Sequence, residues 1–115
     1  LKDKPKEFLI ISGDDDLALG VTLAGGSGVI SVIGQAFPKQ FSTMINHGLQ
    51  GNSREGYEIH YKMMDIIDYI FEENNPAGIK AVLQELEICK EDVRLPLVKS
   101  SSQLKTKIAK FVKSM

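Results

Sequence analysis

The chain has 115 residues, 43% of them hydrophobic and 25% charged, which is the composition of an ordinary globular protein of a single domain. Its net charge of −1 gives no electrostatic reason to expect nucleic acid or an anionic membrane surface as a partner. No apolar run approaches the roughly 20 residues that a membrane helix needs, and the single cysteine, Cys89, excludes an internal disulfide. We therefore expect a cytoplasmic protein without a nucleic-acid or membrane partner.

Two short apolar runs predict the only strands. Residues 8–12 (FLIIS) and 28–32 (GVISV) are continuously apolar, which is typical of strands covered on both faces in a parallel sheet. Residues 14–24 (DDDLALGVTLA) predict a helix between them. The glycines of residues 25–28 (GGSG) predict the turn that ends it, since a phosphate-binding glycine loop would open a helix instead. Strand, helix and strand at this spacing indicate a βαβ unit with parallel strands.

The rest of the chain is predicted to be helical. Pro38 suits the first turn of one helix, and Gly48 and Gly51 mark its end. Asn52 begins a long helix that runs to about Glu73. Its predicted buried stripe consists of Tyr57, Tyr61, Met64, Ile67 and Phe71, broadened by Met63, Ile66 and Ile70.

Two further helices complete the chain. One follows Pro76, and the last is capped by Ser101 or Ser102. Pro96 makes residues 94–98 (RLPLV) an extended connector before the last helix. Two parallel strands are too few for an independent sheet, and the chain starts at Leu1 rather than at a methionine. We therefore expect a piece of a larger α/β sheet or barrel.

Three adjacent carboxylates, Asp14, Asp15 and Asp16, follow the first predicted strand. They admit two interpretations, a divalent-metal site or the polar start of a helix, where the helix dipole stabilises each carboxylate by about 0.3–1 kcal/mol. We favour the helix start, because magnesium usually draws its carboxylates from separate elements. Gly13 is the more informative residue, since glycine lets the backbone approach a ligand closely.

Other candidate groups are isolated. His47 and His60 lie on different predicted helices without metal ligands at suitable spacing, and Cys89 has no nearby histidine. No lysine or tyrosine follows either strand. The residues alone therefore predict neither a metal site nor a complete catalytic apparatus.

Five motifs in order resemble one family. They are FLIISGDDD, GGSGVISV, FPKQFSTM, FEENNPAGIKAVLQ and RLPLV. Together, over about residues 7–98, they resemble the C-terminal part of the pyruvate-dependent class I aldolase and lyase family, which includes N-acetylneuraminate lyase. Three positions depart from the family's usual pattern, namely Asp16, Asn74 and Gly78.

The resemblance implies a fold and a site. The family fold is a TIM (β/α)8 barrel followed by three helices, so residues 1–51 would supply the seventh and eighth βα units and residues 52–115 the C-terminal helical region. The family's Schiff-base lysine and proton-shuttling tyrosine would precede Leu1, leaving no catalytic residue in this chain. Gly13 and the backbone carbonyl of Ile30 match positions that line the pyruvate pocket. No metal or cofactor is implied.

The resemblance also implies an activity. The expected reaction is the condensation of pyruvate with aspartate semialdehyde in the diaminopimelate route to lysine, carried out by a homotetramer. The alternatives are another pyruvate lyase of the N-acetylneuraminate lyase type, or a non-catalytic helical association module. The amphipathic helices after residue 52 motivate the latter.

Overall fold

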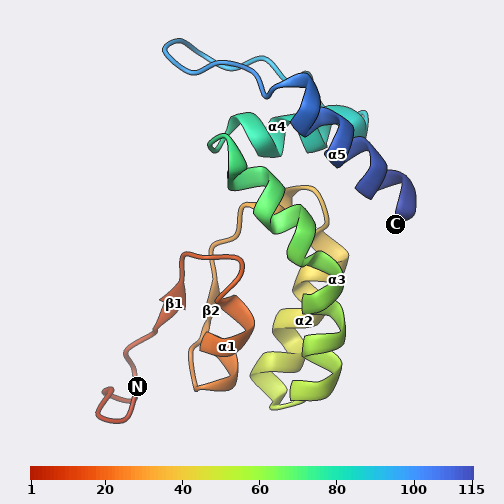
Figure 1. Ribbon diagram of the computed structural model, residues 1–115. Helices are drawn as coiled ribbons and strands as arrows, with labels where there is room; N and C mark the ends of the chain where they lie inside the picture. The colour runs from red at the N-terminus through yellow and green to blue at the C-terminus, as the bar shows by residue number, and fades with distance from the viewer. The chain divides into compact units, whose positions relative to one another are not determined.

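The computed structural model describes residues 1–115 and is mostly helical (Figure 1). The elements are β1 (Ile11–Ser12), α1 (Ala18–Leu23), β2 (Gly28–Val29), the short 3-10 helix η1 (Ile33–Gln35), α2 (Pro38–Gln50), α3 (Ser53–Glu72), α4 (Ala77–Glu85) and α5 (Ser102–Ser114). The chain divides into two compact units, Leu1–Met64 and Asp65–Met115, with α3 contributing to both. No helix is both long enough and apolar enough to cross a lipid bilayer.

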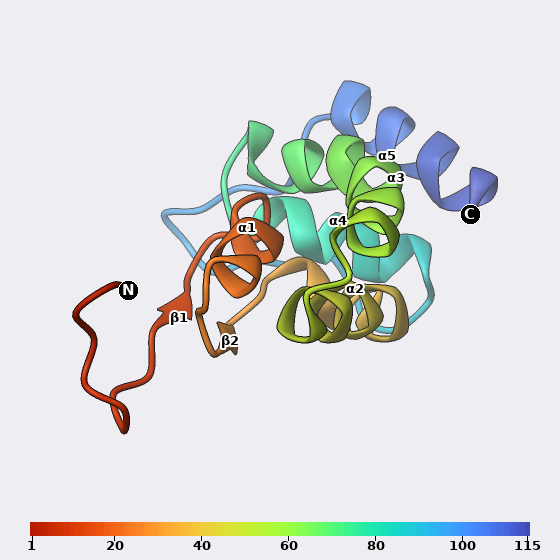
Figure 2. The same ribbon diagram turned by 90° about the horizontal axis from the view of Figure 1, so that it is seen from below.

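The two strands run parallel, which confirms the predicted βαβ unit. Figures 1 and 2 show β1 and β2 side by side, with α1 as the connection between them. In the ladder Ile11 lies opposite Gly28, and Ser12 lies opposite Val29. One further hydrogen bond, from the Ile30 N–H to the Ser12 carbonyl at 3.0 Å, extends the pairing by one residue.

The predicted length of the strands was wrong. Each strand has two residues instead of five, and Phe8 and Leu9 are 58% and 64% exposed rather than buried. A strand is completed by a neighbour that pairs with its backbone, and the outer edges of this two-stranded sheet have no such neighbour. The apolar side chains of residues 8–12 therefore have nothing in this chain to pack against along most of their length.

Helix α1 packs through a single large residue. Leu19 is fully buried between two glycines of neighbouring helices. A Cβ built on Gly48 of α2 would lie 3.1 Å from the Leu19 side chain, and one built on Gly56 of α3 would lie 2.8 Å from it. The helix ends in the predicted glycine turn. Gly25 has φ +109°, and the Gly26 N–H donates to the Val21 carbonyl at 2.8 Å.

The long helix α3 buries a different stripe from the main one predicted. Tyr61, Met64 and Phe71 are 66%, 43% and 45% exposed. The buried side chains are those of His60, Met63, Ile66, Ile67 and Ile70. The apolar arc of this helix is wider than one packing face, so periodicity alone could not decide which side of the arc is covered.

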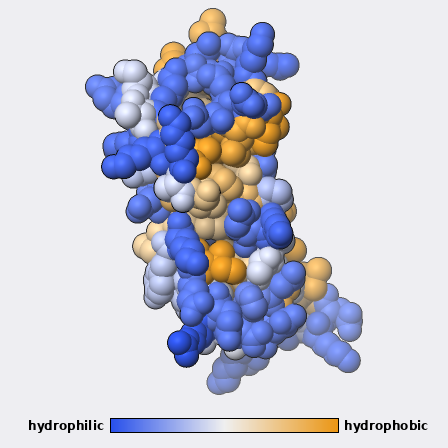
Figure 3. Space-filling view, turned by 90° about the vertical axis from the view of Figure 1, so that its right-hand side faces the viewer, coloured by the Kyte–Doolittle hydropathy of each residue, from blue (hydrophilic) through white to orange (hydrophobic).

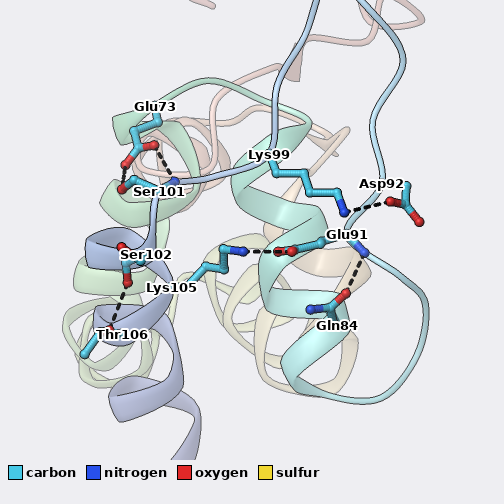
Figure 4. A network of polar contacts seen from close by, with 9 residues as sticks. All are labelled: Glu73, Gln84, Glu91, Asp92, Lys99, Ser101, Ser102, Lys105 and Thr106. Atoms are coloured by element: carbon cyan, nitrogen blue, oxygen red, sulfur yellow. Dashed lines mark hydrogen bonds and ion pairs between the residues drawn. The ribbon is translucent and has the colours of Figure 1, made fainter.

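In the second unit, Glu73 and Ser101 join the end of α3 to the start of α5 (Figure 4). The Ser101 N–H donates to Oε1 of Glu73 at 2.8 Å, and the Ser101 hydroxyl donates to the other carboxylate oxygen. The same hydroxyl accepts the Leu104 N–H at 3.2 Å, so Ser101 is the N-cap of α5, as predicted. These hydrogen bonds hold the pKa of Glu73 below its ordinary value.

Replacing Ser101 with alanine is expected to lower the free energy of unfolding by about 1 kcal/mol for the lost cap. The effect has a pH dependence of known sign. Because the folded-state pKa of Glu73 is depressed, its hydrogen bonds stabilise the fold above the ordinary glutamate pKa and stop doing so as the pH falls through the folded value. The difference between wild type and Ser101→Ala in urea unfolding should therefore be largest near neutral pH. The neighbouring exposed Ser102→Ala is the control, and an equal loss in both variants would contradict the capping role.

The connector between α4 and α5 has polar contacts at its base (Figure 4). Glu91 is buried and accepts from Lys105 at 2.7 Å, while Lys99 lies 2.9 Å from Asp92. This contact lowers the pKa of Asp92 and raises the pKa of Lys99. The apolar side chains farther along are exposed, with Leu95 at 89% and Val98 at 73%.

Candidate functional site

The carboxyl ends of β1 and β2 bring the two predicted pocket residues together. Gly13 follows Ser12, whose carbonyl accepts the N–H of Ile30. Gly13 and Ile30 therefore lie next to each other, directly after the last paired residues of the two strands. Both residues are exposed, and Ile30 is 78% accessible. No atom lies within 4 Å of a Cβ built on Gly13. In α/β folds this edge of a parallel sheet is where ligands bind.

The three aspartates separate instead of forming a cluster. Asp14 and Asp16 are exposed, whereas Asp15 is only 2% exposed. Its Oδ2 accepts the N–H groups of Ile33 at 2.8 Å and Val32 at 3.1 Å, and its Oδ1 lies 3.3 Å from the Val32 nitrogen. No group of three or more histidine, cysteine, aspartate or glutamate side chains is placed to hold a metal ion.

The prediction that the aspartates start the helix was wrong, and neither Asp14 nor Asp15 caps α1. Residues 15–17 form a turn, α1 begins after Leu17, and no side chain caps it. Asp15 caps the start of η1 instead, 17 and 18 residues further along the chain. A periodic pattern reports local structure only, so nothing in the sequence signalled this long-range contact.

Two serine hydroxyls fix the backbone on either side of the candidate site. Ser12 is buried, donates to the carbonyl of Asp14 at 3.0 Å and accepts its N–H at 3.2 Å. Ser31 accepts the N–H of Gly34 at 2.8 Å. Both are tight serine turns, a role that serine often has after a strand. Sequence reasoning gave neither residue a role, although both stand within the family motifs, because a serine turn depends on a backbone conformation that the motifs do not reveal.

An open groove of about 390 Å³ lies on another side of β2. It runs between β2, η1 and α2 and is mainly apolar. Its lining comprises Ser27, Gly28, Val29, Ser31, Gly34, Pro38, Phe41, Ser42, Ile45, Asn46 and Leu49. Neither Gly13 nor Ile30 lines it, so the groove is distinct from the strand-end site.

Comparison with known proteins identifies the family. The sequence model of the Dihydrodipicolinate synthetase family matches residues 1–115. The chain belongs to the dihydrodipicolinate synthetase family. A 4-hydroxy-tetrahydrodipicolinate synthase of Flavobacterium psychrophilum is 49% identical over 115 residues, which are 100% of this chain and 39% of that protein.

Solved structures of family members have the same fold. The dihydrodipicolinate synthase of Aquifex aeolicus matches with a TM-score of 0.92 and 34% identity, over 98% of this chain and 39% of that one. A chloride-inhibited dihydrodipicolinate synthase of Acinetobacter baumannii complexed with pyruvate matches with a TM-score of 0.88 and 26% identity, over 92% of this chain and 36% of that one. The chain thus spans about two fifths of the length of its relatives. Its fold is that of a part of these TIM-barrel enzymes, as the sequence motifs predicted.

No lysine of this family member directly follows either strand in the sequence. None is buried, and none lies between residues 7 and 38, which include both strands. Lys107 pairs with Glu72 at 2.9 Å and lies over the ring of Tyr69 at 5.5 Å. The hydrogen bond with Glu72 raises the pKa of Lys107. An amine nucleophile needs the opposite shift.

Apolar side chains also reach the surface of this dihydrodipicolinate synthetase family member (orange in Figure 3). The largest exposed fractions belong to Leu95, Ile30, Val98, Tyr61, Leu9 and Ile88. They come from residues that flank the strands, from the long helix α3 and from the connector between α4 and α5. Apolar residues scattered singly over a surface are common, so these exposed fractions do not by themselves mark a binding site.

His60 is the one buried histidine of the chain. It is 9% exposed, its Nδ1 has no hydrogen-bond partner, and the ring of Tyr57 lies edge-on at 5.5 Å. Burial lowers the pKa of His60, and the negative charge of Asp16 opposes this only partly. The histidine therefore has a packing role.

Lowering the pH is expected to destabilise the fold through His60. Because the folded-state pKa lies below the ordinary histidine value, the neutral ring stabilises the fold above about pH 6.5, and this contribution is lost as the pH falls through the folded value. His60→Phe should reduce the drop in melting temperature between about pH 7.5 and about pH 5. His47→Phe, at a partly exposed position, is the matched control. An unchanged pH dependence in His60→Phe would contradict this assignment.

Proposed function

We propose that this chain is the C-terminal part of a 4-hydroxy-tetrahydrodipicolinate synthase, a lyase that condenses pyruvate with aspartate semialdehyde through a Schiff base. The observation that carries the proposal is the juxtaposition of Gly13 and Ile30 at the carboxyl ends of paired parallel strands. The synthase names of the relatives and the pyruvate complex of a family member support it. The product would enter the diaminopimelate route to lysine.

In this proposal β1 and β2 are the seventh and eighth strands of the barrel. Residues 1–51 complete the barrel wall, and residues 52–115 form the C-terminal helical region. The short ladder and the exposure of Phe8 and Leu9 support this, because neighbouring strands and helices of a barrel would cover them. The open groove beside β2 would be covered in the same way.

The residues of this chain would line one side of the pyruvate pocket. Gly13 has no side chain, so it leaves room for a ligand against the β1 backbone. Ile30 would present its backbone carbonyl to the ligand. The amine that bonds pyruvate and the tyrosine that transfers protons would come from strands outside this chain. A lysine Schiff base needs no metal or cofactor, because the iminium itself withdraws electrons.

The proposal also includes the setting of the enzyme. We expect a homotetramer in the cytoplasm, with pyruvate and aspartate semialdehyde as its small-molecule partners and no nucleic acid or membrane. A single cysteine that is exposed and unpaired is compatible with a reducing compartment.

Two measurements on the full-length enzyme test the proposal. Pyruvate followed by borohydride should add one pyruvate-derived mass per protomer, located by mass spectrometry on a lysine outside this chain. Turnover with pyruvate should be faster with aspartate semialdehyde than with an amino-sugar aldehyde. Faster turnover of the sugar would identify an N-acetylneuraminate lyase type of enzyme. The absence of any adduct would overturn the Schiff-base mechanism and leave the helical association module.

A further inference from the structure

The side chain of Asp15 connects the backbone segments that follow β1 and β2. It stands two residues after Gly13 and accepts from Val32, which stands two residues after Ile30. The carboxylate therefore connects the backbone that follows one proposed pocket residue to the backbone that follows the other. Its partners lie 17 and 18 residues away, so this contact is tertiary and not part of a local turn.

The chemistry of the contact is strong and oriented. Asp15 is 2% exposed, and a buried carboxylate is tolerated only where hydrogen bonds replace its water. Val32 is the N-cap of η1 and Ile33 is its first residue, so their N–H groups have no acceptor within that helix. One carboxylate oxygen, Oδ2, accepts both groups at 3.1 and 2.8 Å. A single oxygen thus fixes two successive amides.

We infer that Asp15 is a positioning residue for pyruvate: by holding the Val32 and Ile33 amides it sets the place of the Ile30 carbonyl beside Gly13. This inference rests on the proposed function. Only one residue, Ser31, separates Ile30 from the clamped amides, and its hydroxyl is bonded forward to Gly34. A shift of the clamped amides would therefore be passed directly to Ile30. Reacting groups are sensitive to displacements of about 1 Å, which can lower rates by about a hundredfold.

The test compares three variants of Asp15 in the full-length enzyme. Asp15→Ala removes both acceptors, and we expect kcat/KM for pyruvate to fall about 10- to 100-fold. Asp15→Asn can place its amide oxygen at the Oδ2 position and keep both short hydrogen bonds, so it should stay within about threefold of wild type. Asp15→Glu keeps the charge but adds a methylene group, so it should resemble Ala more than Asn. Asp16→Asn, at an exposed neighbouring carboxylate, is the control for charge.

Two readouts separate positioning from stability. The rate of borohydride trapping with pyruvate should follow kcat/KM across the variants, and hydrogen exchange of peptides covering residues 32–33 should speed up in Ala and Glu but not in Asn. If Asp15→Ala does not fold, the Glu and Asn pair carries the same comparison. Folded variants that melt at lower temperature but trap pyruvate at the wild-type rate would overturn the inference. A wild-type enzyme that forms no adduct would overturn the proposed function instead.

Discussion

The 115-residue chain alone is expected to form no product from pyruvate and aspartate semialdehyde and no borohydride-trapped pyruvate adduct. Schiff-base formation needs an amine at the substrate carbonyl with a pKa low enough for attack near neutral pH. None of the lysines here is buried, none lies between residues 7 and 38, and the pKa values of Lys99 and Lys107 are raised by Asp92 and Glu72. Gly13 and Ile30 supply backbone groups, which can orient pyruvate but cannot bond to it covalently.

Mass spectrometry after treatment with pyruvate and borohydride measures this directly. The full-length enzyme, treated in parallel, is the positive control and should gain one adduct per protomer. A stoichiometric adduct at a single lysine of the isolated chain would show that the chemistry lies within residues 1–115. Scattered adducts at several lysines, well below one per chain, would reflect only the ordinary reactivity of exposed amines.

Replacing Gly78 with alanine is expected to lower the free energy of unfolding by about 3 kcal/mol. A Cβ at this position would lie 2.2 Å from the carbonyl oxygen of Ile70 and 2.6 Å from its carbonyl carbon and Cα. These are backbone atoms of a buried helical residue, so the clash is relieved only by moving α4 away from α3. Gly78 is one of the three departures from the usual family pattern, and the structure gives it a packing reason.

Urea unfolding of the full-length enzyme measures the loss, and Gly20→Ala is the matched control. Gly20 lies within α1, and a Cβ there would meet nothing within 4 Å. Alanine at this helical position should stabilise the fold by about 0.5–1 kcal/mol. The two glycine-to-alanine changes are thus expected to have opposite signs. A stabilising or neutral Gly78→Ala would show that α4 can shift without cost.

The starts of α2 and α5 and the end of α2 could be predicted closely, because their signals are local. Pro38 begins α2, Gly51 ends it in the left-handed conformation, and Ser101 caps α5, each within a residue of the expected place. These residues act on the backbone next to them, so no knowledge of the rest of the fold is needed. The glycine turn after α1 was predicted for the same reason.

The strands and the site could be predicted only in part, because both depend on distant residues. Phe8 has the character of a buried strand residue, yet pairing requires a neighbour that hydrogen-bonds to its backbone. The carboxylate of Asp15 was expected at the start of the nearest helix. It accepts hydrogen bonds instead from the N–H groups of Val32 and Ile33, which follow β2. Gly13 and Ile30 were brought together by the parallel register, and the family motifs supplied the reason to look at them. Their role toward pyruvate remains a prediction.

The two-residue ladder of β1 and β2 has a consequence for assembly. A sheet of two parallel strands has two outer edges, and each presents unpaired N–H and C=O groups in a fixed order. In the proposed barrel, a separate polypeptide that carries the other strands would meet both edges at once, and binding at one edge would raise the effective concentration at the other. The two pieces should therefore reassemble from separate chains into a closed ring, with each edge recognising only one end of the partner. The same open edges would drive the chain to self-associate when no partner is supplied.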